Sequence, residues 1–523
     1  MRDDMYLEEY KSKMKKKLFE YDISNGLESV YNTSGRKIIS MKNLSPTSYP
    51  CLSPRDPYYI WEMSYGITSL GVIDGHVYYT RSTAFFYDGK LIGAVSGGKK
   101  KFLNFASKVL IFPDNKCFDT QTMTLTNLSS SVETNIAFIN SDLGVHAIKS
   151  ENSSVNLANT FYAGQGILIS GSGNSIVDGY HYITGVDKNS GLLYFNNYEF
   201  GSASIASVKC VITNEVPSMD SVCICHSRVW GVKGNKIYAS KVDDPKAFCA
   251  FGRDEKDSYK YEYCDTDAFT YIAEYGGSPV VFSSSAIYKI YGDNANNYEL
   301  DILSKSGGIL AEDIGSVAEI DGELYYISHG RPVKFTGVKS VYIKSFPVGD
   351  VSKGVGAAKR GVYYLSCTDE YLDNRFFIYD TDSDSWYEQD ALWISGFVAI
   401  DGNLYGLSSN EAYLLDFDKD APTDTSHEGM VDSELVLDDV YDIGNMLYPA
   451  RIIVRAQLGF GANISFEICY DGNLEWESIN EIVGDGEGVY SILIPPKKCS
   501  SFKLRVKGKG YYCIKNIAVE CGF

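Results

Sequence analysis

The chain has 523 residues, of which 44% are hydrophobic and 22% are charged, so it can bury a core and is not globally disordered. Its 67 acidic residues outnumber 48 basic ones, and the formal net charge of −19 excludes a protein that grips nucleic acid through clustered lysine and arginine. The 48 glycines, 41 tyrosines and 25 phenylalanines favour turns and strands over helices.

Residues 1–49 are predicted to form an N-terminal arm. Five apolar side chains at helical spacing could share one side of a short charged helix there: Met5, Leu7, Tyr10, Met14 and Leu18. The arm has no apolar stretch like that of a secretory signal, and no run of 18 apolar residues predicts a transmembrane helix. With its twelve cysteines thinly spread, the chain is expected to be made in a reducing cytosol with free thiols and no membrane contact.

A glycine turn followed by an alternating, tyrosine-bearing strand recurs along residues 50–420. After an early copy at residues 72–80, the turns are marked by Gly234, Gly277, Gly322, Gly361 and Gly402. Their spacing of about 42 residues, with about four strands in each interval, is the length of a β-propeller blade. We therefore predict a propeller of six to eight blades over residues 50–420.

Two further regions depart from this rhythm. Residues 156–214 interrupt it with self-contained hairpin patterns and are predicted to be a small β-barrel inserted in a blade. Residues 429–523 contain longer alternating strands, such as residues 501–508, and are predicted to be a β-sandwich. The predicted fold class is all-β: a β-propeller with an inserted small β-barrel and a C-terminal β-sandwich.

Asp380, Asp382 and Asp384 alternate with short polar residues just before Trp386. Several oxygens from one tight loop can hold calcium, so these carboxylates are the candidate metal site. The alternative is a hairpin turn in which the aspartates bind backbone amides while Trp386 packs between blades.

Cys223, Cys225 and His226 could begin a zinc site, but no second ligand pair lies nearby, and two cysteines on one face of a strand equally suit a buried surface. The glycines and lysines of residues 96–101 could bind an anion or form an exposed hairpin tip. No nucleophile elbow, Walker loop or HExxH helix is present. We therefore expect no catalytic residues and no cofactor.

Residues 411–442 contain eleven acidic residues and one lysine, which is more than half of the net charge. We predict that this stretch contributes an acidic interaction surface, although a solvated linker explains the same composition. The candidate surface residues are Asp416, Asp418, Asp420, Asp438 and Asp439.

Several motifs occur in a fixed order along the chain. The segment at residues 227–252 carries an R-x-W-G turn, an I-Y-A-S strand and a D-P-x-x-F step. It is preceded by residues 43–56, NLSPTSYPCLSPRD, and followed by residues 280–293, 324–330, 376–389 and 492–510. This order resembles that of a family of tailed-bacteriophage virion proteins. Residues 43–56 look like the family's N-terminal arm, and residues 492–510 look like its C-terminal sandwich, with Lys497 and Lys498 where arginine would be expected.

The resemblance implies a non-enzymatic structural component of a bacteriophage tail or neck, akin to tail nozzles and packaged-DNA stabilisation proteins. Such proteins form a ring around the DNA exit channel, with portal, adaptor or tail proteins as partners and genomic DNA only as passing cargo. The chain would then be located in the virion after assembly in the host cytoplasm. The alternatives are a glycan-binding receptor-recognition protein of the virion and a propeller glycoside hydrolase, which would need two carboxylates across a cleft.

Overall fold

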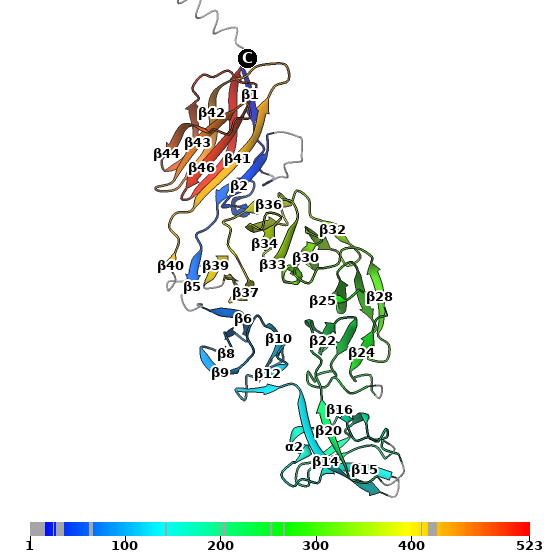
Figure 1. Cartoon of the computed structure of the whole chain (residues 1–523). Helices are drawn as coiled ribbons and strands as arrows, with labels where there is room; N and C mark the ends of the chain where they lie inside the picture. Colours follow the sequence, from blue (N-terminus) through cyan, green and yellow to red (C-terminus); the bar gives the residue numbers. More distant parts are fainter. Residues whose placement is uncertain are drawn as a thin grey trace, which may run out of the picture. The chain divides into compact units, whose positions relative to one another are not determined.

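The computed structural model of the chain describes residues 16–24, 26–27, 36–61, 66–141, 144–197, 199–201, 205–251, 254–264, 267–408, 411–416 and 426–523. These residues form strands and turns, with the short helices η1 (Pro46–Ser48), α2 (Leu157–Thr160) and η3 (Ile314–Ser316), so the chain is all-β (Figure 1). No helix in this described part has the length and apolar character to cross a bilayer. The chain divides into two compact units, Gly66–Ile314 with Phe335–Ser340, and Met1–Tyr65 with Gly315–Lys334 and Val341–Phe523.

The unit that starts at Gly66 contains four antiparallel sheets whose four strands pair in chain order, as in propeller blades. The first two are β6 (Ile67–Ile73), β7 (His76–Arg81), β8 (Ala84–Tyr87), β9 (Lys90–Ala94), and β10 (Lys101–Phe105), β11 (Lys108–Phe112), β12 (Lys116–Asp119), β13 (Thr124–Asn127). The other two are β21 (Ser221–Cys225), β22 (Arg228–Lys233), β23 (Lys236–Ala239), β24 (Tyr259–Glu262), and β25 (Phe269–Tyr275), β26 (Ser278–Ser283), β27 (Ile287–Tyr291), β28 (Glu299–Ser304). Aromatic side chains fill the space between neighbouring sheets, as where Phe85 packs edge-on against Phe118.

Three further sheets of this type follow along the chain. They are β29 (Ala318–Ile320), β30 (Glu323–Ser328), β31 (Arg331–Phe335), β32 (Ser340–Tyr342); β33 (Val351–Lys359), β34 (Val362–Asp369), β35 (Asn374–Asp380), β36 (Ser385–Glu388); and β37 (Gly396–Ile400), β38 (Asn403–Leu407), β39 (Ala412–Asp416) with β5 (Tyr59–Trp61). The last blade thus takes its fourth strand from residues that follow the N-terminal arm, far in sequence from its other three strands, and β40 (Ser426–His427) pairs beyond it. The described residues contain seven blade sheets, where the repeat length predicts six to eight.

The repeated glycines close tight hairpins between strands. Gly322, for example, follows Asp321, and both have positive φ, as a two-residue type I′ turn requires. The marker glycines in the last four blades, from Gly277 onward, all close the first hairpin of their blade. Gly234 instead closes the second hairpin of its blade, so its spacing to Gly277 does not measure a blade length.

An inserted sheet of seven strands lies between the second and third blades of the chain. Its strands are β14 (Ser130–Ser141), β15 (Gly144–Ser150), β16 (Gly166–Ser170), β17 (Gly179–Tyr182), β18 (Gly185–Asp187), β19 (Leu192–Tyr194) and β20 (Val208–Asn214). The insertion was predicted over residues 156–214, and this range omits β14 and β15. Both strands were missed because they have the same alternating pattern as blade strands. The sheet curls around its own apolar core and ends in the edge strands β17 and β18, so the small β-barrel that was predicted has the form of a half-barrel.

The C-terminal residues form a β-sandwich. One sheet has the order β1 (Lys16–Glu20), β47 (Tyr512–Gly522), β42 (Tyr448–Leu458), β45 (Gly486–Leu493). The other has the order β2 (Ile38–Lys42), β41 (Asp432–Tyr441), β46 (Ser501–Lys509), β43 (Asn463–Tyr470), β44 (Glu477–Val483). Alternate residues such as Val454 and Leu504 are fully buried between the sheets.

The N-terminal arm joins this sandwich as strands. Leu18, the last residue of the predicted helical face, lies on β1, which pairs with β47 in the sandwich. The other four residues of that face lie outside the described residues. A small hairpin of β3 (Leu44–Ser45) and β4 (Ser53–Pro54) follows β2 and leads the chain to β5 in the last blade.

Candidate functional site

The predicted calcium residues form the turn between β35 and β36. Asp380 accepts hydrogen bonds from the backbone N–H of Ser383, at 3.1 Å, and from its hydroxyl group. Asp384 accepts a hydrogen bond from the Tyr379 hydroxyl, and Asp382 is exposed. Within the described ranges, no three His, Cys, Asp or Glu residues are grouped to hold a metal ion. These carboxylates therefore shape a hairpin, behind which Trp386 is fully buried.

Cys223 and Cys225 lie on β21, and His226 lies in the turn that follows, with a positive φ of 52°. Burial, assisted by the Glu274 carboxylate, raises the pKa of Cys225 to about 11. In the described part of the chain, Cys223, Cys225 and His226 belong to no group of three His, Cys, Asp or Glu residues that could hold a metal ion. The arrangement is that of a buried apolar strand face.

The lysine-rich turn at residues 96–101 holds an internal ion pair. The Lys100 ammonium lies 2.9 Å from the Asp114 carboxylate, and both side chains are at most 5% exposed. Lys100 also donates to the carbonyl oxygen of Gly97, and Ser96 donates its N–H to Asp114. The ammonium is already neutralised, so it is not an exposed anion-binding group.

The predicted acidic surface is only partly described, because Asp418 and Asp420 lie outside the described residues. Asp416, at the end of β39, lies 3.0 Å from the Lys359 ammonium and accepts a hydrogen bond of 3.0 Å from the Tyr364 hydroxyl. Its side chain is 20% exposed. Asp416 is therefore not a free surface carboxylate, because its charge is matched inside the last two blades.

The remaining acidic candidates lie on β41, beside the basic strand β46. Asp438 and Asp439 are half-buried at a register shift in β41, and Asp439 lies 3.3 Å from the Lys503 ammonium. Further along the same pair of strands, Asp432 lies 3.5 Å from Lys509. The part of the acidic stretch that lies in β41 is therefore not a linker. It forms one strand of the sandwich, and lysines of the neighbouring strand β46 neutralise part of its charge.

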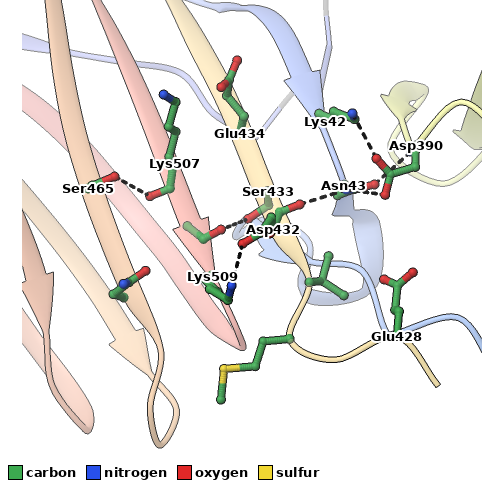
Figure 2. A pocket seen from close by; sticks show the side chains of 14 residues that line it. Lys42, Asn43, Asp390, Glu428, Asp432, Ser433, Glu434, Ser465, Lys507 and Lys509 are labelled. Atoms are coloured by element: carbon green, nitrogen blue, oxygen red, sulfur yellow. Dashed lines mark hydrogen bonds and ion pairs between the residues drawn. The ribbon is translucent and has the colours of Figure 1, made fainter. Parts of the chain in front are cut away.

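A polar pocket of about 690 Å³ opens beside these strands (Figure 2). Its wall on the sandwich side comes from β41, β43 and β46, and includes Glu434, Asn463 and Lys507. Its other wall comes from the N-terminal arm and the loop after β36, where Lys42 lies 3.0 Å from Asp390. The pocket therefore presents carboxylate, amide and ammonium groups side by side.

Arg55 pairs with two carboxylates of this other wall, Asp390 and Glu428. Its guanidinium donates to Asp390 at 2.9 Å and to the side-chain oxygen of Asn43 at 3.1 Å, and it pairs with Glu428 at 2.6 Å. Its side chain is 5% exposed and stacks on the Tyr58 ring at 3.6 Å. One cation thus fastens the N-terminal arm to the loop after β36 and to the segment that leads into the sandwich.

Arg228 of the R-x-W-G segment has a similar buried role in the other unit. Its guanidinium donates to the carbonyl oxygens of Ser240, Asp257 and Glu255. The neighbouring Trp230 is fully buried and donates its indole N–H to the carbonyl oxygen of Cys225 at 3.2 Å. The motif therefore anchors the loop between β23 and β24, because that loop has few ladder hydrogen bonds of its own.

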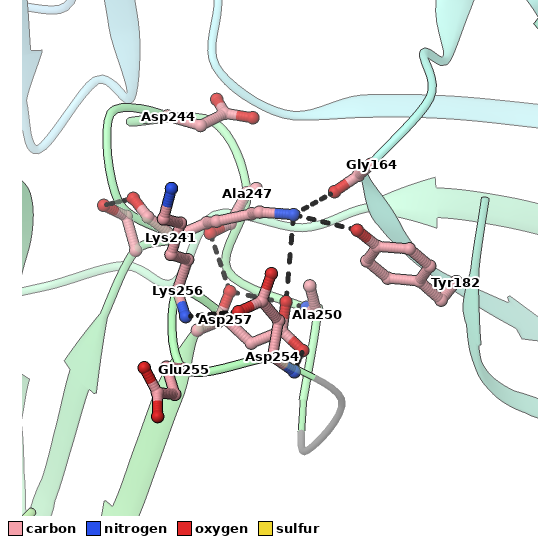
Figure 3. A network of polar contacts seen from close by, with 12 residues as sticks. Gly164, Tyr182, Lys241, Asp244, Ala247, Ala250, Asp254, Glu255, Lys256 and Asp257 are labelled. Atoms are coloured by element: carbon pink, nitrogen blue, oxygen red, sulfur yellow. Dashed lines mark hydrogen bonds and ion pairs between the residues drawn. The ribbon is translucent and has the colours of Figure 1, made fainter. Parts of the chain in front are cut away.

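A second polar network joins the half-barrel to this loop (Figure 3). The Lys241 ammonium donates to the carbonyl oxygen of Gly164 at 3.0 Å and to the Tyr182 hydroxyl at 2.9 Å. The Tyr162 hydroxyl donates to Asp244 at 2.6 Å, and burial together with this carboxylate raises the pKa of the Tyr162 phenol. These three hydrogen bonds hold the insertion against the loop that begins at Lys241 and contains the D-P-x-x-F step.

Sequence reasoning missed the roles of Arg55 and Lys241. Arg55 stands in the segment PRD within the recognised arm, and this local context gave the only available signal. Its partner Asp390 is 335 residues away, so no spacing rule could have joined them.

No protein-family profile matches the chain, and no curated protein sequence matches it significantly. Among solved structures it is similar to PorZ of Porphyromonas gingivalis, with a TM-score of 0.27 and 10% identity over 67% of this chain, which spans 42% of PorZ. It is also similar to the extracellular domain of BT3049 from B. thetaiotaomicron, with a TM-score of 0.21 and 11% identity over 91% of this chain and 92% of that one. The endosialidase of phage phi92 matches with a TM-score of 0.22 and 11% identity, over 80% of this chain and 71% of that one. The chain is thus similar to β-propeller proteins of differing activities, and these low scores carry no functional argument.

Proposed function

We propose that this chain is a non-enzymatic structural component of a bacteriophage tail or neck, similar to a tail nozzle, that forms part of a ring around the DNA exit channel. The proposal is supported by the structural role of the residues that carry the resemblance. Arg228 and Trp230 of the R-x-W-G segment and Arg55 of the N-terminal arm all hold the scaffold together. The recognised residues are thus those of a rigid β framework.

The charge of the chain is compatible with DNA that passes without binding. A net charge of −19 repels phosphate. DNA binding is driven by lysine and arginine groups that displace counterions from phosphate, and an acidic chain supplies too few of them. The carboxylates of Asp416 and Asp439 contribute less to this field than their number suggests, because lysines neutralise them. The proposed partners are further copies of the chain and portal, adaptor or tail proteins, assembled in the host cytoplasm into the virion.

Purification of the full chain alone, and together with the portal and adaptor proteins of the same phage, tests this proposal. Negative-stain electron microscopy and mass photometry should detect closed rings, either of the chain alone or on the adaptor. A chain that stays monomeric in both samples, or that binds neither protein, contradicts the proposal.

Glycan binding is the second candidate, because the polar pocket offers groups that bind hydroxyls. Glu434 and Asn463 line it together with the hydroxyl-bearing Ser465. A glycan array of host surface polysaccharides tests this candidate, with Glu434→Ala as the variant that should lose any signal. Specific binding that this variant abolishes would favour a receptor-recognition protein over the ring component.

A further inference from the structure

One sheet of the sandwich has two open edges. Its strand order is β1, β47, β42, β45, so among the described residues β1 pairs only with β47, and β45 pairs only with β42. An edge strand presents backbone N–H and C=O groups that can pair with a strand of another chain, and proteins commonly protect it with lysine, proline or a β-bulge. β45 has none of these three, since its sequence is GEGVYSIL and its register with β42 is unbroken.

A hydrogen bond just beyond β45 shows which of its backbone groups face outward. Ile494 donates its N–H to the carbonyl oxygen of Ala450 at 2.9 Å, in the same register as the pairs of β42 and β45. Hydrogen-bonded and non-hydrogen-bonded pairs alternate in an antiparallel ladder, so every second residue of β45 turns its N–H and C=O away from β42. These residues, all with exposed side chains, are Glu487, Val489, Ser491 and Leu493.

The same reasoning applies to β1 at the opposite edge. Tyr21, the residue after this strand, donates its N–H to the carbonyl oxygen of Ile517 at 3.0 Å, in the register of β1 and β47. Lys16, Leu18 and Glu20 therefore turn their N–H and C=O groups away from β47. Both edges thus offer alternate residues for pairing.

The outward residues of the two edges also share one face of the sheet. The register places Leu18 opposite Glu520, Glu520 opposite Arg451 and Arg451 opposite Leu493. Paired residues of neighbouring strands have their side chains on the same face, so Leu18 and Leu493 lie on one face. This is the outer face, because their side chains are 47% and 77% exposed, and Val489 beside them is 69% exposed.

The strand directions match as well. Neighbouring strands in this four-stranded sheet are antiparallel, so β1 and β45 run in opposite directions. A second copy in the same orientation, placed beside the first, would set its β1 antiparallel to β45. The outward residues of both strands carry their side chains on the outer face, so this pairing continues the backbone ladder and the two faces together.

The charges of the two edges are of opposite sign. The hairpin of β44 and β45, residues 477–493, contains four acidic residues and no lysine or arginine. β1 begins with Lys16 and Lys17, which pair with Glu520 and Asp442 but remain 66% and 51% exposed. Exposed ion pairs contribute little to stability, so these lysines can turn toward a second copy at small cost. The partner that fits both edges is therefore another copy of this chain.

We propose that copies of this chain join head to tail, with β45 of one copy paired with β1 of the next. This β45–β1 junction extends one antiparallel sheet across two copies, through backbone hydrogen bonds and the exposed apolar side chains of the outer face. It joins two different surfaces, so its repetition gives a closed ring where the rotation closes and an open filament where it does not. The inference rests on the proposed function for the ring alone, since the junction needs only a second copy.

Hydrogen exchange and analytical ultracentrifugation of the purified full chain, at concentrations below and above assembly, test the junction. The amides of residues 16–20 and 486–493 should exchange about tenfold more slowly, or slower still, in the assembled chain. Ser491→Pro removes one outward N–H and leaves the ladder with β42 intact, so it should abolish association without changing the melting temperature of the monomer. Ser491→Ala keeps this N–H and, as the matched control, should associate like the wild type.

The outcomes separate the junction from the proposed ring. Assemblies that persist in Ser491→Pro, or that form without protection of both edges, overturn the junction and leave the proposed function standing. Dimers with protection of residues 486–493 alone would show two β45 strands paired with each other, which also overturns it. Open filaments with both edges protected confirm the junction and contradict the ring. A wild-type chain that stays monomeric, alone and with the portal and adaptor proteins, overturns both.

Discussion

The guanidinium of Arg55 and the carboxylate of Asp390 lie 2.9 Å apart and join the N-terminal arm to the loop after β36. Asp390 also accepts from Lys42 at 3.0 Å and from the Asn43 amide at 2.8 Å. This cluster, Lys42, Asn43, Arg55, Asp390 and Glu428, is called the arm latch below. The arm latch places the nearly buried Arg55 guanidinium in the segment that connects the sandwich strand β2 to the blade strand β5.

Removing the cation should weaken the arm latch. Arg55→Met should lower the free energy of unfolding by about 2–3 kcal/mol, because it leaves two carboxylates without their shared partner. Arg55→Lys keeps the charge but cannot reach all three acceptors, so it should fall between this variant and the wild type. Urea unfolding followed by tryptophan fluorescence measures both. Equal stability of all three proteins would show that the latch does not support the fold.

The latch should also make stability depend on acid. Burial raises the pKa of Asp390, but hydrogen bonds from Lys42, Asn43 and Arg55 outweigh it and hold the pKa below its usual value. A lowered folded pKa contributes stability that is complete above the unfolded value near 3.9 and is lost as pH falls through the folded value.

The free energy of unfolding should therefore decrease from about pH 5 downward, and Asp390→Asn should reduce that slope. Asp382→Asn, which changes an exposed aspartate, is the matched control and should leave the slope unchanged. A series of urea titrations between pH 3 and 7 makes the comparison. Identical slopes for wild type and Asp390→Asn would contradict the assigned role of Asp390.

Arg228 should be required for the blade that carries the R-x-W-G segment. Arg228→Met leaves three backbone carbonyl groups without their donor and should cost about 3 kcal/mol in the free energy of unfolding. The control is Lys233→Ala, at an ion pair with Asp220 in which both side chains are about half exposed, and it should cost less than 1 kcal/mol. Denaturant unfolding measures both variants. A loss of less than about 1 kcal/mol in the free energy of unfolding for Arg228→Met would contradict a structural role for the R-x-W-G segment.

Gly166 should be intolerant of any side chain. A Cβ atom there would lie 2.2 Å from the carbonyl oxygen of Cys249 and 2.4 Å from the backbone nitrogen of Ala250. Gly166→Ala should therefore push β16 of the half-barrel away from the loop between β23 and β24, which carries Cys249 and Ala250. The change should lower the free energy of unfolding by about 1–3 kcal/mol and expose this loop to limited proteolysis. Gly97→Ala, where nothing lies within 4 Å, should do neither. Unchanged proteolysis of Gly166→Ala would argue that the insertion does not rely on this contact.

The blades could be predicted because their turns are local. A two-residue type I′ hairpin needs positive φ at both positions, so pairs such as Asp321–Gly322 mark such turns in the sequence itself. The same reasoning placed Gly234 in the wrong hairpin, because the first hairpin of that blade turns on His226 and Ser227, which have positive φ but include no glycine. The half-barrel began too late in the prediction because β14 alternates like any blade strand and its partner β20 is far along the chain.

The candidate site was harder to predict because charge pairing is not local. The acidic composition of residues 411–442 suggested a surface, but Asp416 and Asp439 pair with lysines from other strands. The spacing of Asp380, Asp382 and Asp384 equally suited a metal loop and a hairpin, and only the hydrogen bonds to Ser383 and Tyr379 decide between them. Composition therefore identified charged segments without showing which charges are neutralised.

Cryo-electron microscopy of purified phage particles that contain this chain tests the central proposal most directly. The account predicts a closed ring of propeller-bearing subunits around the tail axis, into which the seven blade sheets and the C-terminal sandwich fit, with DNA or its channel at the centre. Absence of the chain from purified particles, or its location only in peripheral fibres or spikes, would contradict the proposal.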